Sequence, residues 1–313
     1  MFRARRRTSL RLRLAPPLMF MGTFALLSIA AQITAAPFRQ PASAAAADRT
    51  PCPAGATLAR AAAARHTSGI ATTVDVNLDA GVYTGQTLSI SSAGRSTSLS
   101  LPAESFVGKQ VGDALVYARF ASGKSEVHVV DAASGCDAIV SRPAGIVRSA
   151  VLDPSAAAVY VHAVSNPART DLGVTRYALD GSAATQAVPP LPDDPDFGLT
   201  FGTQLGWSTD GTALFVQSCG AEQCRTRVLD VASNAFTTYA DAGQGSIVGV
   251  TPKHVVTFAA CDGSPCPVIS IDRASAAEKT LAQQAISASI DATAGGSAEA
   301  TITTPAGTTE VDQ

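Results

Sequence analysis

Two stretches of the chain decide the fold: DGTALFVQSCGAEQCRTRVLD at residues 210–230 and PKHVVTFAACDGSPCPVISID at residues 252–272. Each stretch contains a turn, an apolar run, a loop between two cysteines and a second run that ends in aspartate. The same offset of 42 positions separates three pairs of matching residues: Cys219 and Cys261, Cys224 and Cys266, and Asp230 and Asp272. Three marks that share one offset indicate two copies of a single structural unit.

Two earlier copies of this pattern precede the pair. Their second apolar runs end at Asp131 and Asp180, so the four aspartates are spaced by 49, 50 and 42 residues. These intervals lie in or near the range of about 40 to 50 residues for a four-stranded propeller blade. Within each copy, runs rich in β-branched and aromatic residues are bounded by Gly, Pro, Asp and Ser, which is typical of strands and hairpins. We therefore predict an all-β fold.

Weaker copies flank these four, so residues 67–313 contain about six units. We expect a β-propeller of about six four-stranded blades, with five to seven possible. The final copy stops after its third strand, and a fourth strand is expected to come from the N-terminal segment and close the ring. The clear blades are expected at about residues 105–145, 146–190, 200–242 and 244–283.

These residues resemble the TolB-like and YVTN-like group of secreted β-propellers. The likeness is carried best by Thr209-Asp210-Gly211 with the run ALFVQS, and by the strand end Val228-Leu229-Asp230. The sequence departs from the pattern because one copy has the turn reversed, as Gly112-Asp113, and no Trp-Asp pair occurs. The resemblance implies an architecture, and it carries over no catalytic residue and no cofactor.

The N-terminus has the pattern of a signal segment. Six arginines precede an apolar run from Leu18 to Ala31, and small residues follow it up to Ala36. We expect residues 1–36 to be a signal peptide and residues 37–66 an Ala/Pro/Ser-rich linker before the propeller at 67–313. The alternative is an uncleaved anchor, since the nineteen residues from Leu18 to Ala36 could span a bilayer.

The charge of the chain disfavours some partners. Formal net charge is −2, and removal of residues 1–36 leaves 17 basic against 25 acidic residues. The exported domain is therefore acidic, and no Lys/Arg stripe with aromatics between is present, so no nucleic-acid partner is expected. We expect an extracytoplasmic monomer that contacts a membrane only if the N-terminal segment remains uncleaved.

Six cysteines in an exported chain predict three disulfides. Each Cys-bounded loop encloses four residues at a hairpin tip, which favours the pairs Cys219–Cys224 and Cys261–Cys266. The remaining pair, by elimination, is Cys52–Cys136. The rival hypothesis is a four-cysteine metal site, which the oxidising compartment and the loose C-x4-C spacing disfavour.

Few residues suggest chemistry. The four histidines lie outside any recognised motif, and no cofactor motif is present, so we predict no catalytic residue and no cofactor. The acidic loop at Asp193, Asp194 and Asp196 offers oxygen ligands for Ca²⁺ but lacks the spacing of an EF-hand, so a solvated loop is favoured. Arg148, in a predicted innermost strand, is a candidate for lining the central channel, with a structural hydrogen bond as the alternative.

The sequence therefore favours a non-enzymatic binding or protein-interaction module whose partner, a protein or a small ligand, it does not identify. The alternatives are an extracytoplasmic hydrolase or lyase with its site at the channel mouth, and a membrane-tethered accessory domain.

Overall fold

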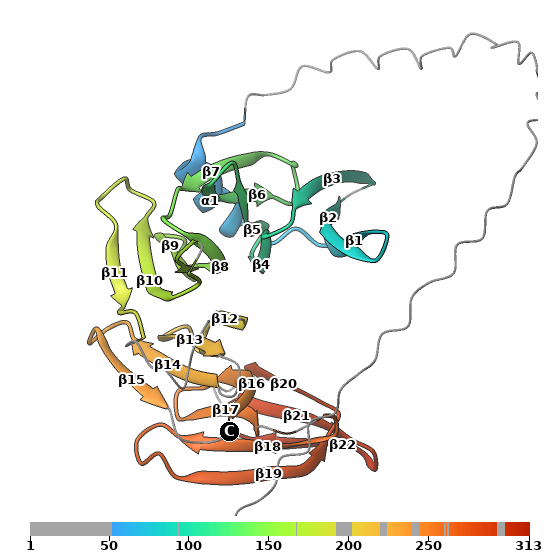
Figure 1. Cartoon of the computed structure of the whole chain (residues 1–313), viewed down its shortest axis with the longest axis vertical. Helices are drawn as coiled ribbons and strands as arrows, with labels where there is room; N and C mark the ends of the chain where they lie inside the picture. Colours follow the sequence, from blue (N-terminus) through green and yellow to red (C-terminus); the bar gives the residue numbers. More distant parts are fainter. Residues whose placement is uncertain are drawn as a thin grey trace, which may run out of the picture. The chain divides into compact units, whose positions relative to one another are not determined.

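The computed structural model of the chain describes residues 52–92, 94–166, 168–191, 202–219, 224–239, 244–259, 261, 263–292 and 298–313. These residues belong to one unit, Pro51–Gln313. They form one helix, α1 (Gly55–Ala63), and 22 strands in six antiparallel sheets that follow one another along the chain (Figure 1). The predicted signal peptide and the first part of the linker lie outside the described residues.

The first three sheets occupy the N-terminal half. The first sheet contains β1 (Ala71–Asp79), β2 (Val82–Ser92) and β3 (Arg95–Pro102). The second contains β4 (Phe106–Val111), β5 (Ala114–Ala121), β6 (Lys124–Asp131) and β7 (Asp137–Ser141). The third contains β8 (Ile146–Leu152), β9 (Ala158–Val164), β10 (Asp171–Ala178) and β11 (Thr185–Val188).

The other three sheets complete the chain. The fourth contains β12 (Gly202–Trp207), β13 (Ala213–Cys219), β14 (Cys224–Asp230) and β15 (Ala235–Tyr239). The fifth contains β16 (Gln244–Val250), β17 (His254–Ala259), β18 (Cys266–Asp272) and β19 (Glu278–Ala285). The sixth contains β20 (Ser287–Ala292), β21 (Ala298–Thr304) and β22 (Gly307–Asp312).

The sheets are arranged as propeller blades. The first strands of successive sheets pack on one another: β4 on β8, β8 on β12, β12 on β16 and β16 on β20. An apolar cluster lies between each sheet and the next, for example Leu214, Val216 and Leu229 against Val151 and Tyr160 between the third and fourth sheets. Burial of these apolar faces stabilises the stack, and the predicted all-β propeller fold is confirmed.

The repeated aspartates have a structural role at the turn after the third strand. Asp230 accepts hydrogen bonds from the backbone N–H and the hydroxyl of Ser233, and Asp272 accepts the same two from Ser275, at 2.7–2.9 Å. In this turn the carboxylate takes the place of a backbone acceptor. These hydrogen bonds lower the pKa of both carboxyls. The recurring Asp therefore marks turn geometry.

The linker predicted at residues 37–66 ends too late, because residues 55–63 form α1, which packs on the second sheet. Leu58, Ala59 and Ala62 are buried there. Ala59 and Ala62 belong to the apolar cluster between the second and third sheets. The run GATLARAAA has strong helix formers and small side chains, so the helix lies close to the strands.

The reversed turn at Gly112-Asp113 is explained by this helix. Gly112 has φ +55°, and a Cβ there would lie 2.2 Å from the carbonyl oxygen of Ala63. Asp113 is buried, and it accepts hydrogen bonds from the backbone and hydroxyl of Thr67 at 2.8 and 2.7 Å. Arg65 bonds both Asp113 and Asp131. The chain that leads to the first sheet is therefore held against the second.

Within the described residues, the expected closing strand is not formed. The first and sixth sheets have three strands each, and β1–β3 and β20–β22 are separate sheets that share no strand. Residues 55–67 cannot supply a missing strand, because α1 packs on the second sheet and Arg65 and Thr67 are hydrogen-bonded to aspartates of that sheet. The other four sheets have the four strands expected, close to the predicted blade boundaries.

Three disulfides join the pairs named from the sequence. Cys52–Cys136 links the segment before α1 to the turn before β7, with a Cα–Cα distance of 5.5 Å and a sequence separation of 84. Cys219–Cys224 joins register partners of β13 and β14, and Cys261–Cys266 bridges the hairpin of β17 and β18.

Among the described residues, no helix has the length and apolar character needed to cross a bilayer.

Candidate functional site

Arg148 lies on β8, the first strand of the third sheet, and its Nη1 donates a hydrogen bond to Oε2 of Glu104 at 2.9 Å. Arg169, in the β9–β10 loop, donates to both carboxylate oxygens of Glu104, at 2.7 and 3.2 Å. The hydrogen bond to Glu104 raises the pKa of Arg169. Arg148 therefore has a structural partner, the carboxylate of Glu104, and its role in lining the central channel stays a prediction.

A groove of about 730 Å³ begins one residue after Glu104, between the first and second sheets. Its apolar wall is formed by Val74 on β1, Leu88 on β2, Phe106 and Val107 on β4, and Leu115 on β5. Its polar lining is formed by Thr72, Gln86, Ser105, Lys109 and Gln110. Pockets of this size with mainly apolar walls and a few polar groups are typical ligand sites.

Among the described residues that line this groove, Lys109 is the one that carries a charge. It lies on β4 and is exposed, and the structure gives it no ion pair with a described carboxylate. Gln86, on the opposite wall, donates a hydrogen bond to the backbone oxygen of Ser105 at 3.0 Å, which fixes one end of the groove. The groove can therefore bind an apolar group that carries a negative charge.

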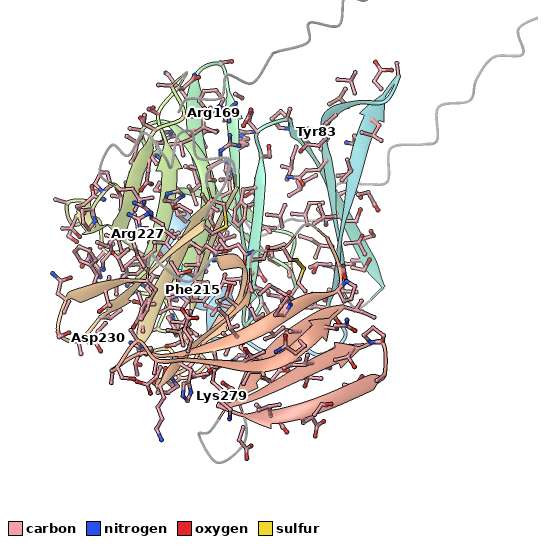
Figure 2. All side chains as sticks on the ribbon, turned by 60° about the horizontal axis from the view of Figure 1, so that its bottom comes forward. Tyr83, Arg169, Phe215, Arg227, Asp230 and Lys279 are labelled. Carbon is pink, nitrogen blue, oxygen red and sulfur yellow. A yellow bond between two sulfur atoms is a disulfide. The ribbon has the colours of Figure 1, made fainter. Side chains whose placement is uncertain are left out.

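The apolar surface continues from the groove along the β1–β2 hairpin. Val74, Val76 and Leu78 alternate on one face of β1 and are 44%, 63% and 64% exposed. Tyr83, labelled in Figure 2, is the register partner of Leu78 and is 44% exposed. Contiguous exposed apolar surface of this kind marks interaction sites.

A polar network on the second sheet is the best candidate for catalysis. His128 on β6 contacts Asp137 through Nδ1 at 3.1 Å, and the hydroxyl of Tyr117 donates to the same carboxylate at 2.6 Å. The rings of Tyr117 and His128 stack with centroids 4.7 Å apart. Burial and the hydrogen bond to Asp137 raise the pKa of Tyr117. Arg119 donates to Glu126, whose carboxylate lies 3.6 Å from His128 Nε2.

A second buried network joins the third and fourth sheets. Asp171 accepts hydrogen bonds from Arg227 at 2.9 Å and from the backbone of Leu191 at 2.7 Å, and contacts His162 Nε2 at 2.5 Å. Arg227, labelled in Figure 2, also donates to the carbonyl oxygen of Pro189. Burial raises the pKa of Asp171, but the hydrogen bond and charge of His162 and the charge of Arg227 outweigh it and hold that pKa well below its ordinary value.

Neither network forms a nucleophilic triad. Within the part of the chain that the structure describes, no hydroxyl or thiol is hydrogen-bonded to a ring nitrogen of His128 or His162, which a triad requires. No group of three or more metal-ligating side chains occurs among the same residues. Asp193, Asp194 and Asp196 lie outside the described residues.

Sequence reasoning did not identify Glu104, Lys109, Arg169 or the exposed face of β1. The period-two pattern of residues 72–78 indicated a strand but contains no signal for which face a neighbour covers. Glu104, the partner of Arg148, lies 44 positions before it, and Arg169, which also binds Glu104, lies 65 positions after Glu104, so only the folded chain brings the three residues together.

No protein-family model and no curated protein matches the sequence. Similar solved structures include TolB from Acinetobacter baumannii, at 12% identity and a TM-score of 0.48, covering 78% of this chain and 63% of TolB. A prolyl endopeptidase structure is similar at 18% identity and a TM-score of 0.48, covering 80% of this chain and 43% of that one. A chain of the nidogen/laminin complex is similar at 15% identity and a TM-score of 0.42, covering 63% and 73%.

The chain spans less than two thirds of the length of the first two structures. At these identities the similarities concern the fold alone.

Proposed function

We propose that the chain is an exported, non-enzymatic binding module whose ligand site is the groove between the first and second sheets. The observation that supports this proposal is an apolar wall beside one cation, Lys109, in a groove whose described lining residues include no carboxylate and give Lys109 no ion pair. A hydrolase with a histidine-activated nucleophile is disfavoured, because neither buried histidine has a hydrogen-bonded hydroxyl or thiol in the described part of the chain.

The proposed compartment is extracytoplasmic. Three disulfides fit an oxidising compartment. The acidic charge of residues 37–313 disfavours nucleic acid as a partner. The ligand is a protein or a small molecule, the chain acts as a monomer, and contact with a membrane requires that residues 1–36 remain uncleaved.

The binding site can be tested with 1-anilinonaphthalene-8-sulfonate, an apolar probe with one negative charge. We expect saturable binding with a fluorescence increase, and about fivefold weaker binding for Val74→Asn and for Lys109→Glu, because the first loses apolar contact and the second reverses the charge. Val231→Asn is the matched control, since Val231 has 40% exposure and lies on the fourth sheet's outer turn, away from the groove.

Binding that is unchanged in Val74→Asn and Lys109→Glu, or weakened equally in Val231→Asn, would contradict the proposed site. Circular dichroism of each variant establishes that a loss of binding is not a loss of fold.

A further inference from the structure

We propose that the groove is the position of a fourth, innermost strand of the first sheet, and that an extended segment of another polypeptide occupies it by pairing with the free edge of β1. The segment carries apolar side chains at alternate positions and one carboxylate that pairs with Lys109. This inference rests on the proposed function, because it assigns a ligand class to the same groove.

Strand order indicates which strand the first sheet lacks. In the second to fifth sheets, the last strand leads to the first strand of the next sheet, as β7 leads to β8. In the first sheet, β3 leads to β4 through three residues, so β3 corresponds to a last strand and β1 to a second strand. The first sheet therefore has no counterpart of β4. That counterpart would pack on β4, as β4 packs on β8, and β4 forms one wall of the groove.

The edge of β1 is suited to strand addition. In the described structure β1 pairs with β2 alone, and residues 71–77 keep regular register with residues 85–91 before a bulge at Asn77/Leu78. Seven residues in extended conformation provide about 24 Å of edge. Native edge strands are commonly protected by charged residues, above all Lys, or by Pro, and the regular stretch of β1 at residues 71–77 contains no Lys, no Pro and one charged residue, Asp75.

The side chains beside this edge are apolar and uncovered. The described residues include eight exposed large apolar side chains, and five of them are on the β1–β2 hairpin. Val82 lies on one face of this hairpin, whereas Val74, Val76, Leu78 and Tyr83 share the other. This face is longer than a small ligand and matches an extended chain, in which every second side chain points to the same side. The side chains of an added strand would extend the apolar face and reach into the groove.

The groove's charge favours an acidic group on the occupant. Lys109 is the one charged residue of its described lining, and Asp75 lies on the opposite face of β1, as the register partner of Thr87. Residues 37–51 of this chain are a poor occupant, because their sequence PFRQPASAAAADRTP contains three prolines and no alternating apolar pattern. We therefore assign the position to a separate polypeptide.

The test uses the whole chain and four heptapeptides based on Val-Thr-Val-Thr-Val-Thr-Val, in which one Val in turn is replaced by Glu. We expect at least one peptide to bind saturably in isothermal titration calorimetry and to slow amide exchange in residues 71–77. Lys109→Glu should lower the affinity for this peptide about tenfold, and a peptide with Lys in place of Glu should restore binding to the variant. Lys124→Glu, a variant at the exposed first residue of β6, is the control and should bind the peptide like the parent.

Backbone pairing is tested by N-methylation of alternate residues in the best peptide, which blocks one edge of the strand at a time. The peptide methylated on the edge that faces β1 should bind at least tenfold more weakly than the parent peptide. The peptide methylated on the other edge should bind like the parent peptide. Equal binding of both isomers would overturn strand pairing. Binding of the anilinonaphthalene probe without any peptide binding would overturn this inference and leave the proposed function standing. Absence of both probe binding and peptide binding would contradict this inference and the proposed function.

Dimerisation of the chain through β1, detected by sedimentation and abolished by Val76→Lys, would also overturn this inference, because the occupant would be a second copy.

Discussion

At the scale of single residues, the buried charges between the third and fourth sheets depend on one another. Asp171 and Arg227 have side chains 3% and 2% exposed, so neither charge is solvated by water. Removal of one member of a buried pair commonly costs about 3–5 kcal/mol, because the other charge stays buried without a partner. His162 adds a third polar group to the same carboxylate.

We expect Asp171→Asn to lower the free energy of unfolding at pH 7 by about 3 kcal/mol, measured by urea denaturation. The folded-state pKa of Asp171 lies below its ordinary value of 3.8. Its stabilisation is therefore present above about pH 4 and is lost as the pH falls below that value, so the difference between parent and variant should shrink at pH 3. Asp180→Asn, at an exposed turn of the same sheet, should cost less than about 1 kcal/mol. A difference that grows at pH 3 would contradict this account.

At the scale of elements, the Cys52–Cys136 disulfide and α1 act together. The disulfide ties the residue three positions before α1 to the turn before β7, and the helix contacts β5, β6 and β7. A cross-link over 84 residues restricts the unfolded chain more than one over five residues. The long-range disulfide therefore stabilises the fold more than a hairpin disulfide.

We expect Cys52→Ser with Cys136→Ser to lower the free energy of unfolding by about 4 kcal/mol, and Cys219→Ser with Cys224→Ser by about 2 kcal/mol, on the loop-entropy estimate. Chemical denaturation monitored by circular dichroism measures both double variants, each of which leaves the other two disulfides intact. An equal loss in the two variants would show that loop length does not determine the effect.

The individual elements show which features of the fold and of the groove could be predicted from the sequence. The aspartates after the third strands and the 42-residue offset indicated strands and blade boundaries, because turn chemistry is local. Helix α1 was assigned to a linker because Ala-rich sequence lacks a clear period. The groove was not predicted, since its walls come from residues 72–115 and depend on which face of β1 remains uncovered. Only the packing of the sheets in the folded chain determines which face of β1 is covered.

At the scale of the whole molecule, the first and sixth sheets have polar outer faces. On the first sheet, cross-strand partners form a hydroxyl-rich surface of Thr73, Thr87, Ser89, Ser91, Ser96, Ser98 and Ser100. On the sixth sheet the corresponding face carries Asp291, Glu299, Glu310 and Asp312. Repulsion from Glu310 raises the pKa of Glu299. These faces resemble the polar outer faces of terminal repeats in solenoid proteins.

Hydrogen exchange measured by mass spectrometry should therefore follow the position of each sheet. In the described part of the chain, each terminal sheet has one apolar interface and each internal sheet has two, so we expect β1 and β22 to exchange first and β13 and β14 last. Uniform protection across the six sheets would contradict this expectation.

The polar end faces also constrain how such a chain can lengthen in evolution. A blade appended at either end would meet a hydroxylated or acidic surface and find no apolar face to bury its own. A blade copied within the array would meet apolar faces on both sides. The fourth and fifth sheets, which share the 42-residue offset and matching disulfides, are internal neighbours. Tandem duplication of an interior blade is thus the route of growth that this fold permits.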